Sequence, residues 1–221
     1  MKRYGQFCSV ARALDLLGDR WAMLVVRELL LGPKRYTDLI DGLPGVGTNV
    51  LAVRLRELED AGIIARERLQ PPAASTVYVL TDDGVALRPV VDELARWGLR
   101  LMDRPEHREA RRASWLVYSL AVSTPPLDMR DDDELELRVN RERHTLTVRD
   151  DRFEARQGAA ANPLAVIEAP LGALFRLARG QATRGELERD GQISVEKDRR
   201  TARGFLDAVE GAWLETSRAS T

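Results

Sequence analysis

One stretch, residues 45–69 (GVGTNVLAVRLRELEDAGIIARERL), constrains the fold more than any other part of the chain. It opens with a glycine-bearing turn, continues with Leu51, Leu55 and Leu58 at helical spacing, and passes Gly62 into a strand-like run. Three leucines on one side predict a helix that buries this side and presents the other to solvent. The chain must therefore fold an exposed charged helix directly beside a short basic ribbon.

The face opposite the leucines carries small, polar and basic side chains. Thr48 is expected to cap the helix, because a threonine hydroxyl can accept a backbone N–H of the first turn. At about 100° per residue, the residues that point away from the leucines are Asn49, Val53, Arg56 and Asp60, with Ala52 and Arg54 on the flanks.

The neighbouring segments extend this pattern in both directions. Helical spacing predicts helices over residues 9–17, 19–31 and 35–43, and PGVG predicts a tight turn before the fourth helix. Strands are predicted over 63–69 and 76–81. Thr81 then opens a long helix to about Met102, which Pro89 bends and in which we expect buried positions at Val85, Leu94, Trp97 and Leu101. This order predicts an α+β winged helix-turn-helix domain over residues 1–102, whose exposed helix fits a major groove and whose ribbon lies against the flanking backbone.

Two sets of residues are candidates for contacting double-stranded DNA. Asn49 suits adenine and Arg56 suits guanine, although an exposed arginine can instead pair with acidic neighbours such as Glu57, Glu59 and Asp60. The net charge of the whole chain is −1, so any phosphate-binding surface must be a local patch. The basic candidates for it are Lys34, Arg35, Arg54, Arg66 and Arg68, and the predicted DNA-facing set also includes Thr48, Ala52 and Val53.

Residues 103–221 predict a second α+β domain with its own core. A polar linker leads to a helix near 108–122, and alternating apolar residues predict three antiparallel strands between 134 and 157. We expect a helix that opens at Asn162 and Pro163, a second with a Thr183–Glu186 capping box, a strand in QISVEKD, and a final amphipathic helix from residue 201.

The first domain resembles the HxlR-type branch of winged-helix bacterial regulators, relatives of the MarR family. The blocks that carry the resemblance are LDLLGDRWAMLVVRELLLGPKRYTDL, LPGVGTNVLAVRLRELEDAGIIAR and YVLTDDGVALRPVVDELARWG. The chain departs from the usual family residues in GVGTNVLA and in PPAAST. The resemblance implies a homodimer on a pseudo-palindromic operator, with dimer contacts from the terminal helices.

The second domain resembles the sterol-carrier-protein type 2 fold through the strands at 134–157, PLGALFRLARGQ and LERDGQISVEKD, although Lys197 replaces a usual glycine. This resemblance implies an apolar cavity between sheet and helices that holds a hydrophobic small molecule. A plain packed core is the alternative for the same side chains. The candidate ligand-binding residues are Leu135, Leu137, Phe153, Leu164, Ile167, Leu171, Leu174 and Phe175.

The sequence gives little support for a disulfide, a metal site or a catalytic site. The single cysteine, Cys8, excludes an intrachain disulfide and a multi-cysteine zinc site, and His107 and His144 lack further ligands at suitable spacing. We expect no metal site and no cofactor. The chain has no nucleophile elbow, phosphate-binding loop or paired histidine and cysteine, so it is predicted to be a non-enzyme. Cys8 is a candidate redox thiol, and the alternative that we favour is a small buried hydrophobe.

The sequence supports three functional hypotheses. The first is a dimeric DNA-binding transcriptional regulator that responds to a hydrophobic small molecule in the second domain. The second is a protein-assembly module, and the third is a lipid or apolar-ligand carrier whose winged helix serves only dimerisation. No apolar run is long enough for a membrane span or a signal peptide, so we expect no membrane partner and a cytoplasmic protein.

Overall fold

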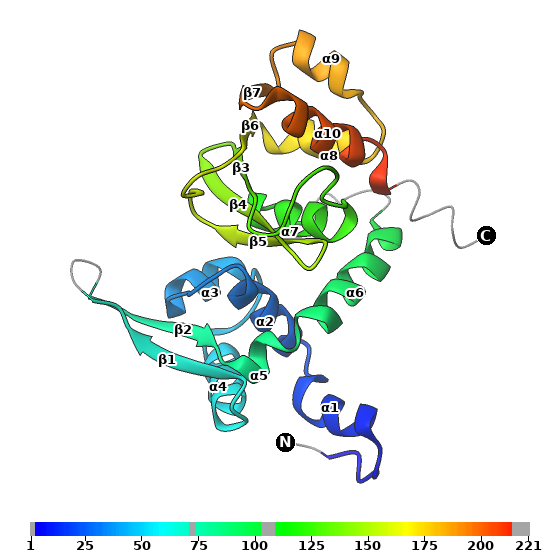
Figure 1. Cartoon of the computed structure of the whole chain (residues 1–221). Helices are drawn as coiled ribbons and strands as arrows, with labels where there is room; N and C mark the ends of the chain where they lie inside the picture. The colour runs from blue at the N-terminus through cyan, green and yellow to red at the C-terminus, as the bar shows by residue number, and fades with distance from the viewer. Residues whose placement is uncertain (1–2, 71–73, 103–108, 214–221) are drawn as a thin grey trace. The chain divides into compact units, whose positions relative to one another are not determined.

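The computed structural model describes residues 3–70, 74–102 and 109–213, which fall into two compact units divided between residues 91 and 92 (Figure 1). The division lies within a helix. The predicted linker begins at residues 103–108, outside the described residues, and the predicted domain boundary after residue 102 stays a prediction.

The first unit contains the predicted helices and ribbon in the predicted order. Its elements, followed by the helix that continues into the second unit, are α1 (Ser9–Leu17), α2 (Ala22–Leu30), α3 (Tyr36–Gly42), α4 (Thr48–Asp60), β1 (Ile64–Arg68), β2 (Thr76–Leu80), α5 (Asp82–Val85), α6 (Arg88–Gly98) and the 3₁₀ turn η1 (Leu99–Leu101). The winged helix-turn-helix fold of the first hundred residues is therefore confirmed.

The three leucines of α4 anchor it to the core of this unit. Leu51, Leu55 and Leu58 are each at most 1% exposed, and they are buried along with Val25 of α2 and Leu39 of α3. Burying one such side chain contributes about 1.5–3 kcal/mol, so the leucine stripe fixes which face of α4 remains in solvent.

The ribbon is joined to the helices at its base, where β1 begins and β2 ends, and by a bridge to the middle of β2. Strands β1 and β2 pair antiparallel, and Lys34 makes an isolated bridge to Tyr78 of β2 with N···O distances of 3.1 and 2.7 Å. Gly62, at φ +74°, turns the chain out of α4 in a conformation that favours glycine. A Cβ at Gly84 would lie 2.1 Å from the carbonyl oxygen of Ile63, so only glycine lets α5 approach the start of β1 this closely.

Two predictions about helix ends need correction. The N-cap of α4 is Gly47, and Thr48 is its first helical residue, so the predicted cap is one residue late. The predicted helix over 81–102 is two helices, because the chain leaves helical geometry at residues 86–87, just before Pro89. Thr81 does cap the first of these, since its hydroxyl accepts the backbone N–H of Gly84 at 3.1 Å.

The burial predicted for four positions of the helix over 81–102 is wrong within the single chain. Val85, Leu94, Trp97 and Leu101 are 47–69% exposed. Leu94, Trp97 and Leu101 follow one another at helical spacing, so they form an apolar stripe on the surface of α6 and η1.

The second unit is a mixed five-stranded sheet with helices, as the predicted α+β class requires. Its elements beyond α6 are α7 (Ala113–Ser123), β3 (Glu134–Val139), β4 (Glu142–Arg149), β5 (Arg152–Gln157), β6 (Ala165–Ala169), α8 (Leu171–Ala178), α9 (Arg184–Arg189), β7 (Ser194–Lys197) and α10 (Arg199–Val209). The strand order is β5-β4-β3-β6-β7, in which only β3 and β6 pair in parallel. The three predicted antiparallel strands and the Thr183–Glu186 capping box are confirmed.

The helix predicted to open at Asn162 is wrong. Residues 165–169 (AVIEA) form β6, which pairs with β3 from Ala165↔Leu135 to Ala169↔Val139, and the helix begins only after Pro170. The β-branched pair Val166–Ile167 favours a strand, but Glu168 is the one polar residue of β6, so the segment shows too little alternation to identify it.

One face of this sheet packs against α7 and α10 (Figure 1). The rings of Phe153 in β5 and Phe205 in α10 meet edge to face with centroids 5.6 Å apart. Between α9 and α10, Arg203 and Arg184 both donate hydrogen bonds to the carboxylate of Glu188. The hydrogen bond from Arg203 lowers the pKa of that carboxyl. These contacts all lie within the second unit.

Candidate nucleic-acid interface

The turn between α3 and α4 sets the position of the exposed helix. Gly45 adopts φ +88°, and the backbone N–H of Val46 donates to the carbonyl of Leu43 at 3.0 Å. The hydroxyl of Tyr36, at the start of α3, donates to the carbonyl of Thr48 at 2.8 Å. The first turn of α4 is therefore tied to α3 by a side chain as well as by the chain connection.

The solvent face of α4 carries the residues predicted for it. Thr48, Asn49, Ala52, Val53 and Arg56 are all exposed, whereas the leucines on the opposite face are buried. The exposed residues recur at helical spacing and so form one continuous surface. This surface has the side-chain types that contact base edges in a major groove.

Arg56 is not paired with the acidic residues beside it in the sequence. Glu57 binds Arg54 at 2.6 Å and Glu59 binds Arg66 at 2.8 Å, so two of the three acidic neighbours serve other arginines. Within the described residues Arg56 makes no ion pair or hydrogen bond. The alternative that Arg56 forms an intrahelical ion pair is therefore not supported.

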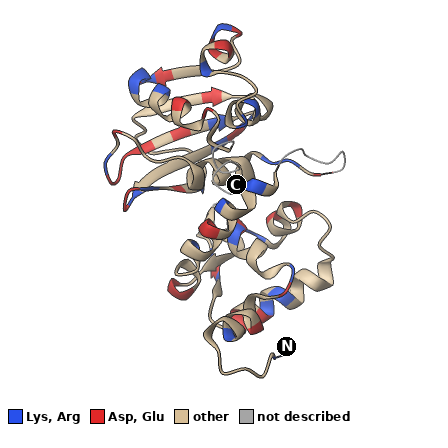
Figure 2. Ribbon diagram, turned by 90° about the vertical axis from the view of Figure 1, so that its right-hand side faces the viewer, with Lys and Arg blue, Asp and Glu red and all other residues tan. Residues whose placement is uncertain are grey.

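Three of the five basic candidates lie exposed around this surface. Arg66 and Arg68 lie on β1, where the Arg66 guanidinium lies 5.5 Å from the ring centroid of Tyr78. Arg35 precedes α3 and donates from Nε to the hydroxyl of Ser75 at 3.0 Å, which links the helix-turn-helix to the start of β2. Figure 2 shows acidic and basic residues interspersed on both units, so any DNA-binding surface is local, as the net charge predicts.

The other two basic candidates are not at the surface. Lys34 is 7% exposed, and its backbone pairs with β2. Arg54 is 8% exposed, and its guanidinium binds Glu57 and, from the turn between α1 and α2, Asp19. The expectation that Arg54 is a surface charge on the flank of α4 is wrong, because that flank faces the α1–α2 turn.

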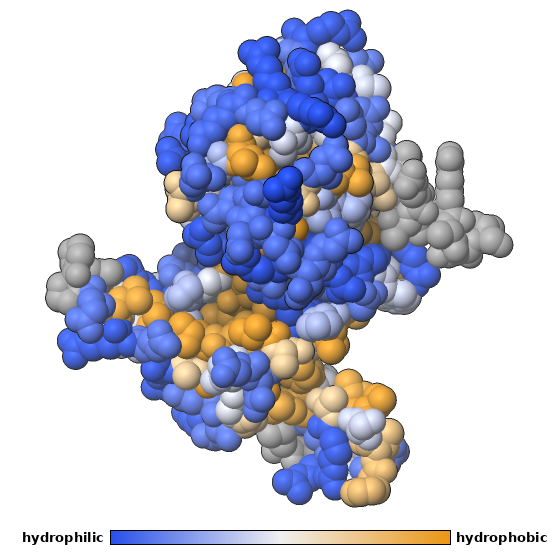
Figure 3. All heavy atoms as spheres, in the orientation of Figure 1, coloured by the Kyte–Doolittle hydropathy of each residue, from blue (hydrophilic) through white to orange (hydrophobic). Residues whose placement is uncertain are grey.

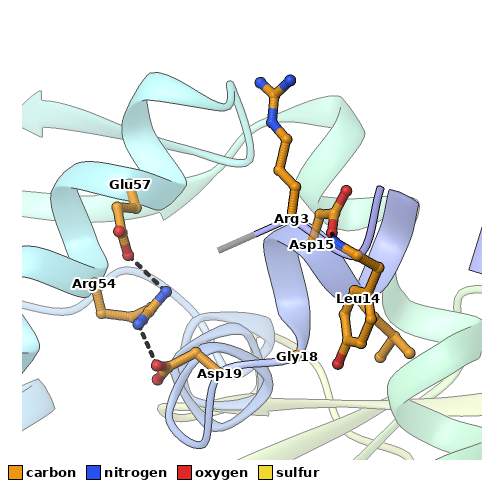
Figure 4. Close-up of a pocket in the computed structure, with 8 residues that line it drawn as sticks. Arg3, Leu14, Asp15, Gly18, Asp19, Arg54 and Glu57 are labelled. Atoms are coloured by element: carbon orange, nitrogen blue, oxygen red, sulfur yellow. Dashed lines mark hydrogen bonds and ion pairs between the residues drawn. The ribbon is translucent and has the colours of Figure 1, made fainter. Parts of the chain in front are cut away.

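The ion pairs of Arg54 form one wall of a cavity of about 440 Å³ in the first unit (Figure 4). Its lining includes three carboxylates and two guanidinium groups. The lining residues are Arg3, Tyr4, Leu14, Asp15, Gly18, Asp19, Arg54 and Glu57. The cavity therefore lies where the ion pair between Arg54 and Asp19 joins α4 to the segment around α1.

The residues predicted to bind a hydrophobic ligand mostly lie in the core of the second unit. Leu135, Leu137, Ile167 and Leu174 are at most 1% exposed and Phe153 is 5% exposed, on the sheet face that α7 and α10 cover and on α8. Leu171 and Phe175 are partly exposed, and the ring of Phe175 meets Trp213 at 5.6 Å. Leu164 is 37% exposed, which sets it apart from the buried set.

Cys8 lies at the surface, immediately before α1. The favoured interpretation of Cys8 as a small buried hydrophobe is therefore wrong. In the described part of the chain, no three acidic, histidine or cysteine side chains gather to form a metal site. The same residues include no helix that is long and apolar enough to cross a bilayer.

Three contributors to this region were missed from the sequence. Tyr36 lies at the start of the predicted helix over 35–43, and helical spacing does not indicate that its hydroxyl donates to the first turn of α4. Asp19 lies in the turn between α1 and α2, and no local pattern indicates that it binds Arg54. Ser75 lies in a loop with no pattern of its own, so nothing in the sequence indicated its contact with Arg35.

Comparison with known proteins identifies relatives of the first hundred residues. The model of a family described as HxlR-like helix-turn-helix matches residues 16–106. The HTH-type transcriptional regulator YvaP of Bacillus subtilis is 36% identical over 92 residues, which are 42% of this chain and 85% of that protein. The HTH-type transcriptional regulator YodB of the same organism is 38% identical over 85 residues, 38% of this chain and 76% of YodB.

Solved structures match the same part of the chain. The reduced form of YodB from B. subtilis covers 46% of this chain and 100% of its own, with 32% identity and a TM-score of 0.39. The redox regulator HypR in its reduced form covers 43% and 95%, with 30% identity and a TM-score of 0.40. These matches extend over less than half of the chain.

Proposed function

Because the chain belongs to the HxlR-like helix-turn-helix family of transcriptional regulators, we propose that it binds a pseudo-palindromic operator as a homodimer and reads it with α4. The observation that carries this proposal is the exposed face of α4. Asn49 and Arg56 lie on it with no ion pair or hydrogen bond to the described residues, and they suit adenine and guanine.

Arg35, Arg66 and Arg68 are proposed to contact phosphates on either side of the reading helix. All three are exposed, and Arg35 is linked to Ser75 next to the ribbon. Thr48 is exposed at the first turn of α4, where backbone N–H groups also suit a phosphate. We leave Lys34 and Arg54 out of the interface, because both are buried.

The homodimer is supported by exposed apolar side chains on the terminal helices. Phe7, Val10 and Leu14 are 44–103% exposed in and just before α1, and Leu94, Trp97 and Leu101 form the stripe on α6 and η1. Figure 3 shows hydrophobic side chains on the surface at the α1 end of the first unit, at the lower right. A second copy of the chain would cover such stripes in a two-fold arrangement.

The second unit is proposed to hold a hydrophobic small molecule that changes DNA affinity, in keeping with its resemblance to sterol carriers. Its sheet and helices enclose the apolar set at Leu135, Leu137, Phe153, Ile167 and Leu174, joined at the surface by Leu164, Leu171 and Phe175. A ligand can shift DNA binding only if it favours one dimer geometry over another, and such couplings are typically about 1–3 kcal/mol. Environment-sensitive apolar dyes and lipid extracts provide the screen, followed by a DNA titration with each compound that binds.

Cys8 is a second candidate for regulation. Its exposure before α1 meets the first requirement of a reactive thiol, which is access. Oxidation at this point would act on the segment that carries Phe7 and Val10. A Cys8→Ser variant that keeps the same DNA affinity under reducing and oxidising conditions, where the wild type loses it, would support this role.

Filter binding with a promoter fragment from beside the chain's own gene tests the proposed function. A regulator retains this fragment in preference to random DNA of the same length. A protein-assembly module or a lipid carrier retains neither, and that result would overturn the proposal. No catalytic activity is proposed.

A further inference from the structure

The centre of the exposed face of α4 is aliphatic. Val53 is 47% exposed, with the exposed Ala52 beside it, between Asn49 and Arg56. A β-branched side chain at an exposed helical position costs helix propensity, because the preceding turn restricts its χ1 rotation. With nearly half of its surface in solvent, Val53 recovers only part of the burial of a core valine. The free protein therefore gives little reason for a valine here, and a bound partner would supply one.

The spacing of this row matches a short stretch of DNA. Asn49, Val53 and Arg56 are separated by four and three residues, so they lie along one side of α4 over about 10 Å. Base pairs rise by about 3.4 Å, so the row spans about three steps. With Asn49 and Arg56 on two base pairs, Val53 falls between them.

The side chain of Val53 has neither a hydrogen-bond donor nor an acceptor. In the major groove, thymine alone presents a methyl group, at C5, and aliphatic side chains contact it. Cytosine presents an amino donor, which would lose water against a valine without gaining an acceptor. Contact with a methyl group is thus the favourable use of this position.

We infer that Val53 contacts the C5-methyl group of a thymine in each half-site, between the bases contacted by Asn49 and Arg56. Ala52, with a single methyl group, leaves room for the base edge to approach the helix. This inference rests on the proposed function and adds to it the identity of one base that the operator must contain.

The test uses the full-length protein and 30-base-pair duplexes that it enriches from a random pool. Each thymine of the enriched sequence is replaced in turn by deoxyuridine, which removes only the C5-methyl group. Replacing the contacted thymine in one half-site should weaken wild-type binding about fourfold, the effect of leaving one methyl group in water. For Val53→Ala, the same replacement should change the affinity by a factor close to one.

Val50→Ala is the matched control, because Val50 is 46% exposed on the same helix but lies about 100° around its axis from Asn49 and about 120° from Arg56. This variant should keep the fourfold sensitivity to deoxyuridine. The inference is overturned if no thymine is sensitive, or if the sensitivity persists in Val53→Ala, while sequence-specific binding itself remains. Failure to enrich any sequence from the pool would overturn the proposed function as well, which is a separate result.

Discussion

At residue 56, the guanidinium remains available for a base because nearby acidic side chains are already paired. Glu57 binds Arg54 and Glu59 binds Arg66, which leaves Arg56 on the solvent face of α4. We predict that Arg56→Ala weakens binding to the selected operator by about 1–3 kcal/mol and relaxes the base preference at one position of each half-site. Fluorescence anisotropy on the operator and on random DNA measures this. Equal losses on both duplexes would contradict a base-reading role.

Arg54, two residues away, has a different role. Its side chain is 10% exposed and binds both Glu57 and Asp19, so removing its charge leaves two carboxylates close together. We predict that Arg54→Met lowers the free energy of unfolding by about 1–2 kcal/mol, discounted because Asp19 is 40% exposed. Urea titration measures this, and the exposed Arg68→Met should change stability by less than about 0.5 kcal/mol. Unchanged stability with weakened DNA binding would instead place Arg54 on a phosphate.

Among the elements, the ribbon formed by β1 and β2 is proposed to hold DNA without reading it. Arg66 and Arg68 are exposed on β1, beyond the end of the α4 face. We predict that each alanine substitution weakens binding to operator and random DNA alike and reduces the slope of log K against log salt by about one. Arg152→Ala, an exposed arginine of β5, should leave the slope unchanged. A loss confined to the operator would show that the ribbon reads sequence.

The elements also show what a sequence can and cannot predict. The leucine spacing of α4 correctly predicted its buried and exposed faces, because that spacing follows directly from helix geometry. The same spacing does not predict the burial of the flanks. Arg54 faces the α1–α2 turn, and no local pattern indicates which distant segment packs beside a flank. The strand β6 was predicted as a helix, because Glu168 is its one polar residue and so short a segment shows too little alternation.

The apolar stripe on α6 and η1 bears on the oligomeric state of the whole molecule. Leu94, Trp97 and Leu101 were expected in the core of the chain and instead lie at its surface, 52–69% exposed. The spacing of apolar residues predicts that a face is covered, and it does not say whether the cover belongs to the same chain.

We therefore predict that the protein is a homodimer at micromolar concentration, with a mass twice the 24.8 kDa of one chain. Trp97→Glu should convert it to a monomer, because a charge would be buried in the apolar interface. Sedimentation equilibrium measures both states. Leu127→Glu, at a leucine of similar exposure outside α1 and α6, should remain dimeric. A monomeric wild-type protein at this concentration would contradict the predicted homodimer.

The central claim, that the molecule is a regulator that reads DNA with α4, is tested most directly by one ratio. This is the affinity for the operator selected from a random pool divided by the affinity for a scrambled duplex of the same composition at the same salt. For the wild-type protein we predict a ratio of about 10³ or more, because specific sites exceed random DNA by this factor. For the Asn49→Ala/Arg56→Ala variant we predict a fall of at least about tenfold, with the affinity for scrambled DNA little changed. A wild-type ratio near one, or a ratio that the double substitution leaves unaltered, would contradict the account.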